Sequence, residues 1–259
     1  MQETERGKIS RLSTPVDEAY KALRTNIRFC GAVSRIKTIA ITSSTAGEGK
    51  TTTCINLARS MADAGMRTLL VELDLRKPAL EKYLGMRRKA GITDYITGEV
   101  DLEDIIYSTG IKNLYITPCG TIPPNPAELL NSEKFSEFLD SVKDNYFISV
   151  KGQFDVVILD TPPLGNVIDA AIVASKADGT LLVIKSNAIN YKLAQQVKAQ
   201  LEKANANLLG VVINNVAKKE LKYGYKYYYD YYNYYESDEE KKGKKFIPFK
   251  KIANLFFRQ

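Results

Sequence analysis

The stretch KTIAITSSTAGEGKTT, residues 37–52, joins a run of apolar residues to a short glycine-containing loop and then to a helix-like segment. Gly47 and Gly49 permit a tight loop whose backbone N–H groups converge at the start of a helix. Lys50 and Thr51 follow at once, which gives G-x-x-x-x-G-K-[ST] with Ser44 in the first position. This pattern predicts a phosphate-binding loop, whereas a plain glycine turn is the alternative.

A phosphate loop of this kind predicts ATP as the nucleotide and Mg²⁺ as its companion ion. Lys50 can reach the outer phosphates, and the Thr51 hydroxyl can ligate the ion. The expected nucleotide-binding residues are Ser44, Thr45, Ala46, Gly47, Glu48, Gly49, Lys50, Thr51, Thr52 and Asp160.

Further apolar runs recur along the chain, at 67–73, 113–117, 154–160, 179–184 and 208–214. Several are apolar at successive positions, as in strands that are buried on both faces of a parallel sheet. Helical patterns occur at 16–29, 51–64, 132–142 and 190–204. The alternation predicts an α/β fold with a doubly wound, mostly parallel sheet.

Carboxylates follow two of the predicted strands. Glu72 and Asp74 lie at the end of LLVELDLRKP (69–78), together with Arg76, and Asp160 ends VVILDTPP (156–163). Ligands of such sheets bind beyond the carboxyl ends of the strands, so we expect Thr51, Asp74 and Asp160 to hold Mg²⁺. The alternatives are a helix-capping role for Asp160 and an ordinary ion pair between Arg76 and the first two acids.

The composition limits the other functional classes. The chain has no histidine, and its three cysteines (Cys30, Cys54 and Cys119) lack a metal-binding spacing, which argues against zinc. Residues 241–259 hold seven basic side chains and no acid, so they account for the whole net charge of +7. A neutral body argues against a nucleic-acid-binding face. The polar first residues and the strand-sized apolar runs predict a cytoplasmic chain.

The C-terminal part changes character after Asn215. YGYKYYYDYYNYY, residues 223–235, places nine tyrosines in thirteen positions, where no core could bury them. We divide the chain into an N-terminal helical segment (1–35), a P-loop domain (36–217), a flexible tyrosine-rich tail (218–240) and a basic amphipathic segment (241–259).

Taken together, the motifs resemble those of the bacterial tyrosine kinases (BY-kinases), in particular the cytoplasmic type of Gram-positive bacteria. SSTAGEGKTT (43–52) resembles the Walker A motif of that family, LLVELDLRKP its Walker A′ and FDVVILDTPP (154–163) its Walker B. PCGTIPPNPAELLNS (118–132) and the tyrosine tail resemble two further family segments. EAYKALRTNIRF (18–29) resembles the helix through which the subunits of this family contact one another.

The resemblance implies a MinD/ParA-like P-loop fold and an ATP-dependent protein-tyrosine autokinase that controls exopolysaccharide or capsule assembly. Lys50, Glu72, Asp74 and Arg76 would be catalytic. Lys50 would neutralise phosphate charge, Asp74 or Glu72 would accept the phenolic proton, and Arg76 would contact phosphate or fix the carboxylates. The phosphate acceptors would be Tyr223, Tyr225, Tyr227, Tyr228, Tyr229, Tyr231, Tyr232, Tyr234 and Tyr235 on a neighbouring subunit.

The implied partners are a membrane-embedded activator of the polysaccharide co-polymerase type, a tyrosine phosphatase and further copies of the chain. The copies would form a phosphorylation-sensitive ring through Glu18, Lys21 and Arg24, and the activator would recruit the chain to the inner face of the membrane. The basic segment 241–259 would contact an anionic membrane or the activator; folding back on the domain and disorder are its alternatives.

Four features depart from the family pattern. Ala46 replaces a proline, Glu72 replaces an aspartate, and Lys21 replaces an arginine in E-x-x-R-x-x-R, so that a bidentate clamp is lost. Residues 145–153 look like an insertion. Two other functions therefore remain open: a MinD/ParA-like ATPase that switches oligomerisation and membrane binding, although Thr45 occupies the position of its signature lysine, and a nucleotide-regulated scaffold with reduced catalysis.

Overall fold

The computed structural model describes residues 13–30, 36–165, 167–187 and 191–216. The described residues up to Asn215 belong to one compact unit. Its sheet has the strand order β3-β4-β2-β5-β1-β6-β7. The strands are β1 (Thr38–Ser43), β2 (Thr68–Glu72), β3 (Tyr107–Ser108), β4 (Leu114–Thr117), β5 (Val156–Asp160), β6 (Gly179–Lys185) and β7 (Leu208–Asn214). All neighbouring pairs are parallel except β3 with β4, which confirms the predicted mostly parallel α/β fold.

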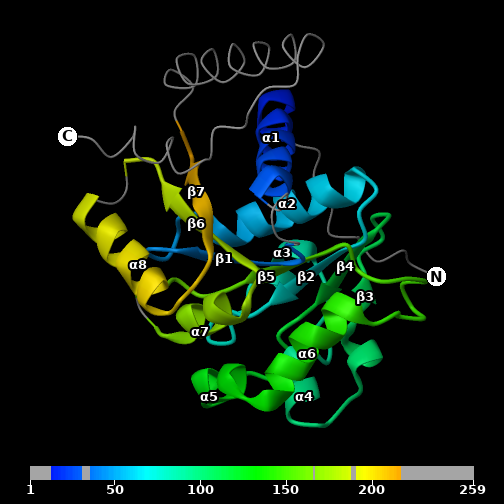
Figure 1. Cartoon of the computed structure of the whole chain (residues 1–259). Helices are drawn as coiled ribbons and strands as arrows, with labels where there is room; N and C mark the ends of the chain where they lie inside the picture. Colours follow the sequence, from blue (N-terminus) through cyan, green and yellow to red (C-terminus); the bar gives the residue numbers. More distant parts are fainter. Residues whose placement is uncertain (1–12, 31–35, 166, 188–190, 217–259) are drawn as a thin grey trace. The chain divides into compact units, whose positions relative to one another are not determined.

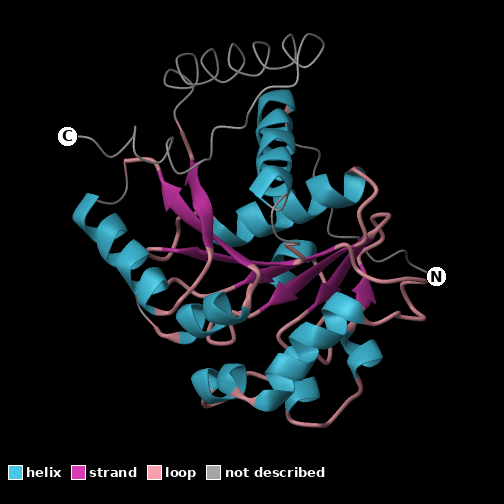
Figure 2. Ribbon diagram, in the orientation of Figure 1, coloured by secondary structure: helices cyan, strands magenta, loops and turns pink. Residues whose placement is uncertain are grey.

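Helices cover both faces of the sheet, as Figures 1 and 2 show. They are α1 (Thr14–Cys30), α2 (Lys50–Asp63), α3 (Leu80–Leu84), α4 (Ile92–Ile96), α5 (Pro126–Asn131), α6 (Glu133–Asp144), α7 (Asp169–Lys176) and α8 (Tyr191–Lys203), with a 3₁₀ turn at Leu102–Ile105. The four longest, α1, α2, α6 and α8, agree with the helical patterns of the sequence. The short helices α3, α4, α5 and α7 were not predicted.

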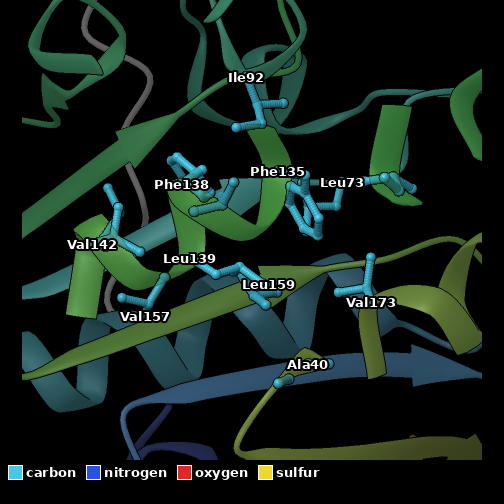
Figure 3. Packing of buried hydrophobic residues seen from close by; sticks show 14 of the residues in the cluster. Ala40, Leu73, Ile92, Phe135, Phe138, Leu139, Val142, Val157, Leu159 and Val173 are labelled. Carbon is cyan, nitrogen blue, oxygen red and sulfur yellow. The ribbon is translucent and has the colours of Figure 1, made fainter. Parts of the chain in front are cut away.

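The strands alternate between two hydrophobic clusters. Ile39 and Ile41 of β1 face the cluster that also contains apolar residues of α1, α2 and α3, whereas Ala40 faces the larger cluster on the other side. In that larger cluster, Phe135 and Phe138 of α6 pack as stacked rings 6.2 Å apart (Figure 3). Burial of both faces explains why β1, β2 and β5 are apolar at successive positions.

Residues 145–153, which look like an insertion, form a small turn that packs on the larger hydrophobic cluster. Phe147 and Gly152 make an antiparallel bridge, and Phe147, Val150 and Phe154 are buried. Asp155, directly after this turn, accepts a hydrogen bond of 2.7 Å from the Arg67 backbone N–H. Since β2 and β5 begin next to these residues, the insertion lies at the amino-terminal edge of the sheet, away from the phosphate loop.

Candidate active site

The phosphate loop connects β1 to α2 in the way that the sequence predicts. Gly47 and Gly49 have φ of 82° and 88°, the left-handed conformation that favours glycine. A Cβ atom on Gly49 would lie only 2.0 Å from Nδ2 of Asn214. That amide donates a hydrogen bond of 2.9 Å to the Glu48 backbone oxygen. Asn214, at the end of β7, therefore fixes the phosphate loop by a hydrogen bond to its backbone. No sequence motif indicated this contact, because the two segments are far apart in the chain.

Glu48 closes the loop from inside. Its side chain is buried, and Oε2 accepts a 2.8 Å hydrogen bond from the Thr45 backbone N–H. Glu48 Oε1 and the buried Ser44 hydroxyl have no hydrogen-bond partner among the described residues. Ala46, Gly47 and Thr52 are exposed on the outer side of the loop and helix. The side chain of Glu48 thus fixes the loop by a hydrogen bond within it, and two buried polar atoms of the loop lack a partner among the described residues.

Lys50 and Asp160 form the centre of the site. Lys50 Nζ lies 2.5 Å from Asp160 Oδ1, and both side chains are almost fully buried. Burial alone would lower the pKa of Lys50, but Asp160, together with Cys54 and Asp74, raises it overall. Lys50 Nζ also lies 3.4 Å from Thr51 Oγ1. The predicted phosphate-binding cation, the Walker B acid and the Thr51 hydroxyl are therefore together.

Glu72 lies at the end of β2, next to Asp160 in the adjacent strand. Its Oε2 accepts hydrogen bonds of 2.8 Å from the backbone N–H groups of Ala79 and Leu80, where α3 begins. Its Oε1 accepts one of 3.2 Å from the Asp74 N–H. Burial, reinforced by Asp160, raises the pKa of Glu72 to about 8. Glu72 therefore ties together both ends of the loop at residues 73–79.

Asp74 is only partly buried, at the surface end of the same loop. Its Oδ1 accepts a 3.1 Å hydrogen bond from the Lys77 backbone N–H. Burial raises the pKa of Asp74, and the positive charge of Lys50 opposes that rise. The two side chains therefore interact electrostatically. Asp74 is thus the acidic side chain of this loop that a group arriving from solvent can reach.

Arg76 has a different partner from those that the sequence suggested. Its Nε and Nη2 donate hydrogen bonds of 2.7 and 3.1 Å to the two carboxylate oxygens of Asp169. The alternative in which Arg76 forms an ordinary ion pair with Glu72 or Asp74 is not seen, because the guanidinium is aligned on Asp169. Asp169 is fully buried at the start of α7. Sequence reasoning missed it, since α7 itself was not predicted.

The donor set fits a magnesium ion. Asp160 Oδ2 is buried without a hydrogen-bond partner among the described residues, and a hydroxyl (Thr51) and a second carboxylate (Asp74) belong to the same site. Within the described part of the chain, no three acidic, cysteine or histidine side chains gather into a metal centre. Mg²⁺ matches this arrangement, because it is bound by few protein ligands together with phosphate and water.

Comparison with known proteins places this chain in a family. A protein-family profile described as an AAA domain matches residues 36–213. The tyrosine-protein kinase CpsD of Streptococcus pneumoniae is 39% identical over 82% of this chain and 90% of its own length. The tyrosine-protein kinase YwqD of Bacillus subtilis is 36% identical over 80% of this chain and 85% of its own. The chain belongs to the bacterial tyrosine kinase family.

Solved structures agree with this assignment. The kinase domain of the Escherichia coli tyrosine kinase ETK superposes on this kinase with a TM-score of 0.72 at 28% identity, covering 82% of this chain and 85% of that one. The chimerical protein CapA2B2 gives a TM-score of 0.72 at 33% identity, over 80% and 87% of the two chains. The septum site-determining protein MinD of Pyrococcus horikoshii, complexed with Mg-ADP, gives 0.56 at 28% identity over 68% and 69%. The predicted MinD-like fold is therefore confirmed, and the kinase binds nucleotide.

The residues expected at subunit contacts lie on α1 of the kinase, which packs on α2. Lys21 forms ion pairs with Asp17 and Glu18 at 2.9 and 2.8 Å on the exposed side. Arg24 donates hydrogen bonds to the backbone oxygen and the hydroxyl of Ser60 on α2. In a single chain these three residues thus have partners within the subunit, and their role between subunits stays a prediction.

The remaining expectations concern parts of the kinase outside the described residues. The nine tail tyrosines and the basic segment 241–259 belong to this part. Among the helices that the structure describes, none has the length and apolar character required to cross a bilayer. Cys54 and Cys119 are buried and Cys30 is partly buried.

Proposed function

We propose that this kinase transfers the γ-phosphate of ATP to the tyrosines of its own C-terminal cluster, on a neighbouring copy of the chain. The observation that supports this most is the convergence of Lys50, Asp160 and Asp74 at the carboxyl edge of the sheet, in a chain that carries nine tyrosines within residues 223–235. A dense acceptor cluster on the same chain is what an autokinase requires.

The phosphate loop supplies the binding energy and the orientation. Backbone N–H groups of the loop at residues 44–51 would bind the phosphates at the N-terminus of α2. Lys50, paired with Asp160 at 2.5 Å, turns its ammonium group to the phosphate oxygens and counters the charge that develops during transfer. Thr51, Asp74 and Asp160 would hold Mg²⁺, which neutralises phosphate charge when bound.

We propose that Asp74 accepts the proton of the attacking phenol. A tyrosine has an ordinary pKa of about 10, so it must lose its proton during transfer at neutral pH. Asp74 is partly exposed, so a tyrosine that arrives from solvent can reach its carboxylate. Both oxygens of Glu72 are instead bound to backbone N–H groups of the loop. Glu72 is therefore a positioning residue that keeps Asp74 and Arg76 in place.

The wider role that we propose is the control of capsule or exopolysaccharide assembly. It rests on the family resemblance of the motifs, as do the membrane-embedded activator, the phosphatase and the ring. Residues 218–259 carry eleven basic and six acidic side chains, and each phosphate adds about −1.5 to −2 charges at neutral pH. Three phosphates therefore cancel the net charge of the tail, so phosphorylation would change the contacts of the tail with other copies.

Incubation with ATP labelled at the γ-phosphate, in the presence of membranes that carry the natural activator, tests this function. Label on tail tyrosines supports the autokinase. Release of free phosphate with no labelled protein would support the MinD/ParA-like ATPase, and neither product would support a nucleotide-regulated scaffold. The variant Lys50→Met is the control for contaminating kinases.

A further inference from the structure

A stretch of positive charge follows the catalytic loop of the kinase. Residues 76–89 contain six basic side chains and one acidic side chain, Glu81. Arg76 is engaged by Asp169, and Glu81 accepts a hydrogen bond of 3.0 Å from the Lys89 backbone N–H. The remaining basic residues, Lys77, Lys82, Arg87 and Arg88, are exposed and form no ion pair with any described residue. We call these four residues and Lys89 the basic strip.

The strip begins at the active site and leads away from it. α3 starts where Glu72 binds the backbone, and Leu80 and Leu84 anchor it on the face of the sheet that α2 covers (Figure 1). Further along, Lys89 Nζ lies 4.1 Å from the centre of the Tyr107 ring on β3. The Tyr107 hydroxyl donates a 3.1 Å hydrogen bond to the Ala90 backbone oxygen.

The end of the strip is fixed at the carboxyl edge of the sheet. Ile92 donates a backbone hydrogen bond to Pro118, just beyond the end of β4. Thr93 likewise donates a backbone hydrogen bond of 3.0 Å to the Cys119 carbonyl oxygen, so the chain that continues from Lys89 lies on the same side of the sheet as the catalytic carboxylates. The strip therefore runs along this edge from Asp74 at β2 towards β4 and β3.

We propose that the basic strip binds the acidic run Glu236–Glu240 in the tail of a second copy of this chain, and thereby guides the preceding tyrosines to Asp74. The inference deepens the proposed function and rests on it. The run ESDEE contains four acidic residues and directly follows Tyr235, the last acceptor. Exposed basic side chains beside an active site can attract and bind an acidic segment such as this run.

The dimensions of the two segments agree. An extended chain advances about 3.3–3.6 Å per residue, so the acidic run covers about 17 Å beyond Tyr235. The five-residue helix α3 rises about 7.5 Å, and residues 86–90, which lie outside the helices and strands, add at most about 17 Å. A tyrosine of the cluster can therefore reach Asp74 while the acidic run contacts the strip.

A second copy suits this geometry better than the chain's own tail. The own tail starts beyond β7, at the edge of the sheet opposite to β3. β1, which leads into the phosphate loop, lies between β7 and β2 in the strand order. The point at which the described chain ends and the strip thus lie on opposite sides of the phosphate loop in the strand order, whereas the tail of another copy can approach the strip from solvent.

Binding of a synthetic peptide of residues 223–240 to the full-length chain tests the strip without catalysis. We expect Arg87→Glu/Arg88→Glu to weaken binding at least tenfold, and a peptide with the acids of 236–240 replaced by amides to bind the wild type equally weakly. Lys112→Glu/Lys151→Glu makes the same charge change on exposed lysines at the amino-terminal edge and should alter binding less than twofold. Equal binding of the peptide by the two double variants would overturn the proposal.

A second measurement connects the strip to transfer. Two differently tagged full-length copies are expressed in the source cells: an active donor, and an acceptor with Lys50→Met, which can be labelled only by the other copy. Arg87→Glu/Arg88→Glu in the donor should reduce phosphotyrosine on the acceptor at least fivefold, and changing the acidic run of that acceptor to lysines should restore it.

The outcomes separate the two claims. No phosphotyrosine on the acceptor with a wild-type donor refutes the proposed transfer between copies, while the peptide measurement still decides what the strip binds. Undiminished labelling by the strip variant refutes the inference alone. Loss of binding to anionic vesicles of phosphatidylserine and phosphatidylcholine, with normal labelling, would make the strip a membrane contact and would also overturn the inference.

Discussion

Arg76 and Asp169, 93 residues apart in sequence, are joined by hydrogen bonds of 2.7 and 3.1 Å. The pair connects the loop after β2 to the first turn of α7 and aligns the guanidinium on both carboxylate oxygens. Such bidentate, charge-assisted contacts fix orientation more firmly than single hydrogen bonds. The side chain of Arg76 is 43% exposed, whereas the carboxylate of Asp169 is buried. Asp169 therefore relies on Arg76 to compensate its charge, because water cannot reach it.

Replacing Arg76 with methionine should therefore destabilise the kinase through Asp169. The variant leaves a buried carboxylate without its charged partner, which we expect to lower the free energy of unfolding by about 1–3 kcal/mol. Urea unfolding measures this. The double variant Arg76→Met/Asp169→Asn should recover part of the loss, and Lys77→Met, which changes an exposed neighbour, should have no effect. A single variant as stable as the wild type would show that the pair is structurally unimportant.

The two glycines of the phosphate loop should respond differently to alanine. Both have positive φ, so each substitution strains the backbone by about 1–2 kcal/mol. A Cβ atom on Gly47 meets nothing within 4 Å, whereas one on Gly49 would overlap Asn214. Gly49→Ala should thus abolish binding of a fluorescent ATP analogue, while Gly47→Ala weakens it only moderately. The reverse order would mean that Asn214 does not hold the loop.

The stability of the nucleotide-free kinase should depend on pH through Glu72. Its pKa is raised to about 8 in the folded state, against an ordinary value of about 4.3 in the unfolded chain. Between about pH 4.3 and about pH 8, Glu72 is protonated in the folded chain and ionised in the unfolded chain. The contribution of Glu72 to the free energy of unfolding is therefore complete below about pH 4 and is lost as the pH rises through about 8. From pH 5 to pH 8.5, the free energy of unfolding should fall by at least about 1 kcal/mol.

Glu72→Gln is the control for this pH effect, because a glutamine oxygen can still accept the hydrogen bonds from Ala79 and Leu80. The variant should lose most of the slope. The chain has no histidine, so few other side chains titrate in this range. Urea unfolding at several pH values checks the slope, and an unchanged slope in the variant would assign it to another group.

The same variant separates the roles of the two carboxylates in catalysis. Asp74→Asn should lower the rate of tyrosine phosphorylation at least 100-fold, because general bases contribute about 10²–10⁴ in rate. Glu72→Gln keeps the hydrogen bonds from Ala79 and Leu80 and loses only the longer one from Asp74, so it should lower the rate less than tenfold. Single-turnover phosphorylation at saturating ATP and Mg²⁺ measures both. A larger loss for Glu72→Gln would transfer the proton-accepting role to Glu72.

The sequence predicts a site best where all the residues of the site lie in one short segment. The loop at 44–51 and the apolar strands around it were predicted because their glycines, Lys50 and buried alternation are local patterns. Asp160 was predicted because it ends such a strand. The contacts of Arg76 with Asp169 and of Asn214 with the loop were not, since each joins segments that only the folded sheet brings together.

The role of Glu72 was also beyond the reach of the sequence. Its position beside Asp74 suggested a base, but the hydrogen bonds that occupy its oxygens come from backbone N–H groups, which have no sequence signal. The short helices α3 and α7 were missed for a related reason. Helices of five and eight residues contain too few turns to show a clear apolar period.

The central claim is that Lys50 and its partners phosphorylate the tyrosines of residues 223–235. Mass spectrometry of the tail, from source cells that express either the wild type or Lys50→Met in place of the natural copy, tests it most directly. The account predicts several phosphorylated tyrosines per wild-type chain and none in the variant. Equal phosphorylation of the tail in both, or an unmodified tail in the wild type, would contradict it.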